Sequence, residues 1–195
     1  VLQNIQEEIL TALQQTFWCN KLGLEVCIHA LLLAKRGLNI PQCFIMFAFG
    51  GCGLSILTDL IDTALGEFHA FFDPYIFYDD DEMRKVVESL AGRICLSAQE
   101  RPQGNSRKQL LVNLWKKFLT GEGLRARMPY AILTRMIKLV GWVRMEVNSL
   151  LAFAEMSEKD FESVLRRACV IPVFARFFDA SYLDSNLKNC LLYTS

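Results

Sequence analysis

The segment AFGGCGLS at residues 48–55 has the spacing of a loop that binds phosphate. In the pattern G-x-x-x-x-G-K-S/T, glycines let backbone N–H groups surround the phosphates, the lysine neutralises phosphate charge, and the hydroxyl holds Mg²⁺. Ala48 replaces the first glycine here, and Leu54 replaces the lysine. The pattern predicts binding of ATP and Mg²⁺, with Ser55 on the metal, and impaired hydrolysis. The expected nucleotide-binding residues are Gly50, Gly51, Cys52, Gly53, Leu54 and Ser55.

The segments on either side of the glycines support this interpretation. An apolar run from Gln42 to Phe49 has the length and composition of a buried strand. Apolar residues then recur at helical spacing from Ser55 to Gly66, where the glycine ends the helix. A glycine-rich loop between a strand and a helix is the context in which such loops bind phosphate. The alternative is an ordinary strand-to-helix turn.

The rest of the chain alternates between the two periodicities. Helices are expected at residues 2–17, 24–35, 79–90, 109–119 and 160–167, and strands at 93–98, 132–147 and 169–174. Residues 68–77 are aromatic and extended in character, and residues 121–130 are expected to form a loop or hairpin. Strands that alternate with helices predict an α/β sheet flanked by helices rather than a helical bundle.

We expect three parts along the chain. A helical segment covers residues 1–38, a nucleotide-binding domain covers 39–180, and a tail covers 181–195. The last six residues, 190–195, resemble a translated sequencing adapter, and the chain starts without Met, so we expect a fragment of a longer protein.

Composition excludes some functional classes. The 21 basic and 21 acidic residues balance, so no overall charge attracts nucleic acid or a membrane. No apolar run reaches the roughly 18 residues that a membrane span requires, so no membrane contact is expected. The seven cysteines lack a C-x-x-C pair and fit reduced thiols inside a cell, in cytoplasm or nucleus. His29 and His69 lie far apart, which argues against a zinc site.

The order of several motifs, from about residue 22 to 179, resembles the helicase domain of superfamily three, in the branch that accompanies phage, plasmid and large-DNA-virus primases. Residues 90–100, LAGRICLSAQE, resemble the strand that ends in the acid of the second Walker motif. Residues 115–123 and Ala126-Arg127 resemble the family's K-x-L-T-G-G-D and downstream A-R. Residues 166–174, RRACVIPVF, resemble its R-R and I-P-F segments. The resemblance implies an AAA+ P-loop ATPase that forms a homo-oligomeric ring, typically a hexamer, and moves along single-stranded or forked DNA.

The resemblance also implies three catalytic residues. Glu100 would polarise the attacking water or help to hold Mg²⁺, and Asn148 would sense the γ-phosphate. Arg167, or its neighbour Arg166, would act as an arginine finger on an adjacent subunit. The alternatives are a solvated loop residue for Glu100, a turn residue for Asn148, and a surface ion pair for Arg167.

For DNA, the family uses a hairpin that projects into the ring channel. Arg125, Arg127 and Tyr130 are the matching residues, and Arg135 and Lys138 follow them. Cations interleaved with an aromatic ring suit a phosphate backbone and a stacked base. A solvated amphipathic strand pair is the alternative.

The departures from the family leave two functions open. Leu54 removes the lysine, residues 121–123 read GEG instead of GGD, and no proline follows Asn148 closely. Arg93 or a neighbouring subunit is a candidate substitute cation. The first function is an ATPase that unwinds DNA during replication of a virus-like or mobile element, with impaired or altered hydrolysis. The second is a catalytically inactive relative that serves ring assembly or DNA binding.

Overall fold

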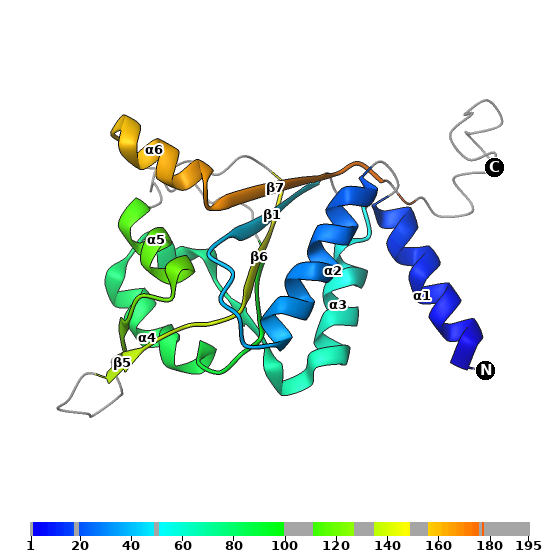
Figure 1. Ribbon diagram of the computed structural model, residues 1–195, viewed down its shortest axis with the longest axis horizontal. Coiled ribbons are helices and arrows are strands. Elements are labelled where there is room, and N and C mark those ends of the chain that lie inside the picture. The colour runs from blue at the N-terminus through cyan, green and yellow to red at the C-terminus, as the bar shows by residue number, and fades with distance from the viewer. Residues whose placement is uncertain are drawn as a thin grey trace.

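The computed structural model describes residues 2–17, 20–48, 51–99, 111–126, 135–148, 156–175 and 177. Its centre is a five-stranded sheet in which every paired neighbour is parallel (Figure 1). In spatial order the strands are β2 (His69–Phe72), β3 (Cys95–Gln99), β6 (Trp142–Val147), β1 (Cys43–Ala48) and β7 (Ala168–Val173). The predicted α/β sheet is therefore confirmed, and it is compatible with a P-loop NTPase-like fold.

Helices cover both faces of this sheet (Figure 1). The described α-helices are α1 (Leu2–Thr16), α2 (Lys21–Lys35), α3 (Leu54–Leu65), α4 (Asp80–Leu90), α5 (Val112–Thr120) and α6 (Glu158–Leu165). Helices α2 and α3 pack on one face, and α4 and α5 pack on the other. Because side chains alternate along each strand, neighbouring residues such as Trp142 and Val143 enter different apolar clusters.

The two helices expected before the first strand are present, although α2 begins three residues before the expected position. Asn20 causes the early start, because its side chain accepts a hydrogen bond from the Gly23 N–H at 2.8 Å. The same side chain donates to the Pro172 carbonyl of β7 at 3.2 Å. A Cβ at Gly23 would lie 2.7 Å from Ile171 of β7, so glycine allows the helix to approach the sheet closely.

The aromatic segment 68–77 is only partly extended. After β2 it forms a single 3₁₀ turn at Pro74–Phe77, because the Asp73 side chain accepts from the Tyr75 N–H and proline fixes its own φ. The segment expected as a loop or hairpin, residues 121–130, contains one described strand, β4 (Leu124–Ala126). This strand pairs antiparallel with β5 (Arg135–Ile137), which lies in the segment 132–147 that was expected to contain one or two strands. No helix within the described residues is both long and apolar enough to cross a membrane.

Candidate nucleotide-binding site

The glycine-rich loop follows the carboxyl end of β1, and later strands of the chain are added to the sheet on both sides of this strand. From β1 the chain moves to β2, returns through β3 to β6, and places β7 on the other side of β1. In open α/β sheets, ligands bind at such a switch point, outside the carboxyl ends of the strands. The loop therefore lies where this fold places ligands.

The loop backbone has the shape of an anion-binding nest. Gly51 and Gly53 both have φ of 81°, in the left-handed region, and the right-handed helix α3 begins at Leu54. A left-handed residue followed by right-handed ones turns successive N–H groups toward a common point. The positive end of the α3 dipole lies at the same place. Gly50 lies outside the described residues.

The side chains of the loop divide into two groups. Leu54 and Cys52 are buried in the apolar cluster beneath α2 and α3, with 5% and 7% of their surface exposed. Ser55 is exposed on the first turn of α3. The backbone cradle and the Ser55 hydroxyl therefore fit phosphate and Mg²⁺, whereas position 54 anchors the helix to the core and supplies no charge.

A residue from the far end of the chain lies against this loop. The Phe177 N–H donates to the Gly51 carbonyl at 2.7 Å. A Cβ built on Gly53 would lie 2.8 Å from the Phe177 ring and 3.2 Å from Oγ1 of Thr16, at the end of α1. The glycine thus permits close contact with an aromatic ring on one side and with α1 on the other.

The described residues among those expected to be catalytic lie at opposite ends of the parallel strands. Asn148 directly follows β6 and is exposed beside the loop's strand, whereas Glu100 lies outside the described residues. Arg167 directly precedes β7, so it lies at the opposite, amino edge. Its Nη1 donates to the carbonyl and hydroxyl of Ser163, at 3.0 and 2.7 Å. Arg167 therefore cannot reach the loop of its own subunit.

Arg93 does not replace the missing lysine within the chain. It precedes β3 at the amino edge of the sheet, and its guanidinium donates to the carbonyls of Glu67 and Ser89. A substitute cation for the loop therefore does not come from Arg93 of the same chain.

A buried ion pair lies beneath α3 and was not predicted. Arg144, on the central strand β6, is fully buried and donates to the Glu146 carboxylate and to the Thr58 hydroxyl, the latter at 2.7 Å. Thr58 in turn donates to Glu146. Burial raises the pKa of Glu146, although Arg144, Thr58 and Gln99 oppose the increase. These contacts tie the second turn of α3 to the strand beside β1.

A second polar group lies on the same face of the sheet. Nδ1 of His69 lies 2.8 Å from Asp62 on α3, and Nε2 lies 2.8 Å from the Ser97 hydroxyl on β3. This is the order of a serine hydrolase triad, but Ser97 is only 2% exposed and no substrate can reach it. We call Thr58, Asp62, His69, Ser97, Arg144 and Glu146 together the polar seam.

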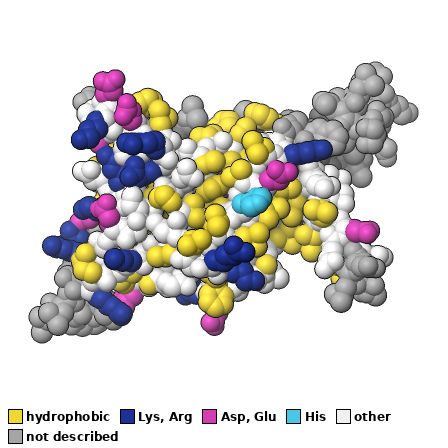
Figure 2. Space-filling view, viewed as in Figure 1, with side chains coloured by type: hydrophobic (Ala, Val, Ile, Leu, Met, Phe, Trp, Pro, Cys, Tyr) yellow, Lys and Arg dark blue, Asp and Glu magenta, His cyan; other side chains and the backbone are white. Residues whose placement is uncertain are grey.

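The described part of the hairpin carries one of the three expected DNA-binding residues. Arg125 is exposed on β4, opposite Met136 of β5, and Arg135 is exposed beside them. Arg127 and Tyr130 lie outside the described residues. Figure 2 shows Lys and Arg side chains gathered over the end of the molecule that carries α5, α6 and this strand pair, with Asp and Glu among them.

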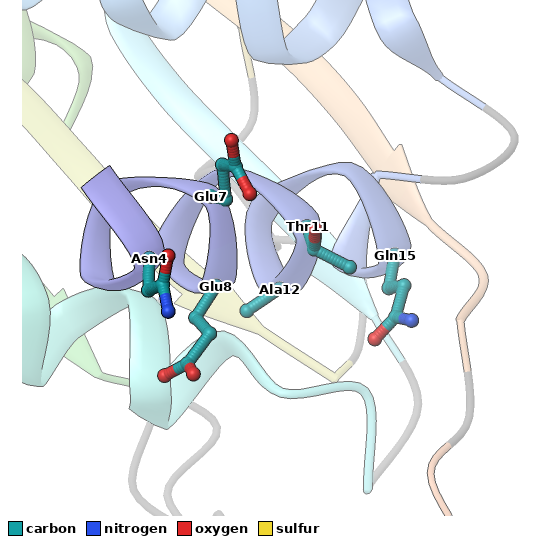
Figure 3. A pocket seen from close by; sticks show the side chains of 6 residues that line it. All are labelled: Asn4, Glu7, Glu8, Thr11, Ala12 and Gln15. Atoms are coloured by element: carbon teal, nitrogen blue, oxygen red, sulfur yellow. The ribbon is translucent and has the colours of Figure 1, made fainter. Parts of the chain in front are cut away.

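Other parts of the described chain carry no comparable site. A groove along α1 is lined by one face of this single helix, with Ala12 among polar side chains (Figure 3): Asn4, Glu7, Glu8, Thr11 and Gln15. Among the described residues, no three His, Cys, Asp or Glu side chains are placed to hold a metal ion. Burial raises the pKa of the Cys95 thiol to about 11, so this cysteine is not a nucleophile near neutral pH.

Comparison with known proteins gives a likeness in fold. No protein-family model matches the sequence, and no curated protein matches it. The A form apo structure of the NrS-1 C-terminal region has a TM-score of 0.59 and 15% identity, and the match covers 97% of this chain and 40% of that one. Another apo structure of that region has a TM-score of 0.59 and 17% identity, covering 86% and 38%. This chain therefore spans about 40% of the length of those chains.

Proposed function

We propose that this chain is a helicase-like ATPase domain of the superfamily three kind, which binds ATP and Mg²⁺ through residues 50–55 and hydrolyses ATP poorly. The observation that supports this most directly is the nest at Gly51 and Gly53, at the start of α3 and at the switch point of the sheet. The likeness to the C-terminal region of NrS-1, a phage primase-helicase, supports a replication-related helicase-like protein only coarsely.

The residues would divide the work as follows. The loop N–H groups would bind the β- and γ-phosphates, and the Ser55 hydroxyl would ligate Mg²⁺, which neutralises phosphate charge. Asn148, beside the loop's strand, would orient the attacking water, and Glu100 would polarise it. Leu54 supplies no cation, so both binding and transition-state stabilisation are expected to be weak.

Partners follow from the same proposal. DNA would contact Arg125, Arg127 and Tyr130 on the hairpin. Because Arg167 lies at the amino edge of the sheet, it would act only on the nucleotide of a neighbouring subunit in a ring. Loss of oligonucleotide binding in Arg125→Ala, measured by fluorescence anisotropy, would support the hairpin assignment. Unchanged binding would contradict it.

Calorimetric titration of the whole chain with Mg-ATP tests the nucleotide site. We expect weak binding that Ser55→Ala reduces, because the exposed hydroxyl is the expected metal ligand. Thr63→Ala is the matched control, since Thr63 is also exposed on α3 but two turns away. Absence of binding by the native chain, or binding that Ser55→Ala leaves unchanged, would contradict the proposal.

The second candidate is a catalytically inactive relative that keeps the fold for assembly or DNA binding. The packing of Leu54 in the core favours it, because the residue that should contact phosphate stabilises the fold instead. This candidate predicts no Mg-ATP binding by the native chain. It also predicts that Leu54→Lys, checked by thermal melting for retained folding, does not create binding unless the lysine leaves the apolar cluster.

A further inference from the structure

The contact between Phe177 and the glycine-rich loop joins two distant parts of the sequence. Strand β7 ends at Val173, and four residues later the Phe177 N–H donates to the Gly51 carbonyl at 2.7 Å. Phe177 as a whole residue is still 43% exposed. The ring therefore covers the loop from outside and is not part of the core.

The ring occupies the space that Gly53 leaves free. Glycines in phosphate-binding loops let the phosphates approach the backbone, because no Cβ is present. At Gly53, the position of that Cβ lies 2.8 Å from one ring carbon of Phe177 and 3.3 Å from another, with Oγ1 of Thr16 at 3.2 Å. A phosphate that approached Gly53 from this side would collide with the ring.

We infer that Phe177 is a latch that closes the glycine-rich loop and competes with the polyphosphate of a nucleotide for it. This inference rests on the proposed function, because a latch needs a ligand to exclude. The latch is weak: the contact of a half-exposed ring, which buries only part of its apolar surface on the loop, would change an equilibrium about three- to tenfold. A ligand of moderate affinity displaces it, so the latch raises the concentration of nucleotide that the loop requires.

Inorganic tripolyphosphate with Mg²⁺ is the probe, because it has no base that could stack on an aromatic ring. We expect Phe177→Ala, which loses the ring and keeps the backbone N–H, to bind it about three- to tenfold more tightly than the native chain does, by calorimetry. Phe174→Ala is the matched control, since Phe174 directly follows β7 and is 57% exposed, and its affinity should equal that of the native chain. Equal thermal melting of the three proteins would show that folding is unchanged.

The other outcomes separate the two proposals. If the native chain binds tripolyphosphate and Phe177→Ala binds it equally or less tightly, the latch is wrong and the nucleotide site stands. Weaker binding of tripolyphosphate by Phe177→Ala than by the native chain would mean that Phe177 is part of the binding site. If only Phe177→Ala binds, the latch is supported and is stronger than expected. If neither protein binds, the nucleotide site is wrong, and the latch with it.

Discussion

The two faces of the sheet are packed by different chemistry. On the face covered by α4, α5 and the hairpin, a large cluster of buried side chains is wholly apolar and includes Phe77, Trp115 and Phe118 with their rings in contact. On the face covered by α3, the polar seam lies between the helix and strands β2, β3 and β6. Both faces bury apolar side chains, and the second adds directional contacts to the helix that starts at the glycine-rich loop.

The difference shows how this fold can position its loop. Apolar contacts tolerate small shifts of a helix, whereas hydrogen bonds lose strength when distance or angle changes. Thr58 is one turn after Leu54, and it is fixed to Arg144 and Glu146 on the strand next to β1. The polar seam therefore fixes the position of α3 along the strands, relative to their carboxyl ends.

The largest effect is expected on the apolar face. Trp115→Ala would remove a fully buried ring that packs against Phe77, and such deletions cost about 4 kcal/mol of unfolding free energy. Chemical denaturation measures this loss. Lys117→Ala, exposed on the same helix, should change the free energy little. Similar losses for both variants would contradict the assignment of this face as the main core.

A smaller effect is expected from the polar seam. Arg144→Met would leave the mostly buried Glu146 carboxylate without its charged partner, at a cost of about 3 kcal/mol. The double variant Arg144→Met with Glu146→Gln should recover part of this loss, because no unpaired charge remains. Additive losses in a double-mutant cycle would mean that the two side chains do not interact, which would break the comparison between the faces.

The smallest effect concerns pH. Burial raises the pKa of Glu146 above its ordinary value of 4.5. At a pH between the pKa of this carboxyl group in the unfolded chain and its pKa in the folded chain, the folded chain therefore holds a proton that the unfolded chain has lost. This contribution to stability is therefore greatest at low pH and falls as pH rises through the folded pKa. Glu146→Gln should remove this fall. If the unfolding free energies of the native chain and of Glu146→Gln change in parallel from pH 4.5 upward, this prediction is contradicted.

Local patterns predicted much of the fold. The strand at β1, the helix at α3 and the helix at α4 follow from apolar periodicity and from caps within a few residues of their ends. The position of the loop followed from the spacing of Gly51 and Gly53. These features depend on neighbours in sequence, which a sequence displays directly.

Contacts across the sheet were not predicted. Ser97 meets His69, and Arg144 meets Thr58, only because the strands take the order that they do, and no spacing in the sequence encodes that order. The orientation of Leu54 into the core and the contact of Phe177 with Gly51 are likewise products of tertiary packing. A buried arginine followed two residues later by glutamate within an apolar strand was the one available signal for the ion pair.

The central claim is that backbone N–H groups of the glycine-rich loop bind polyphosphate. Amide chemical-shift changes in ¹⁵N-labelled protein, titrated with Mg-tripolyphosphate, test it most directly, because each N–H is observed separately. We predict the largest shifts at Gly51, Cys52, Gly53, Leu54 and Ser55. No shift at these amides at saturation, or larger shifts on the β4–β5 strand pair than on the loop, would contradict the claim.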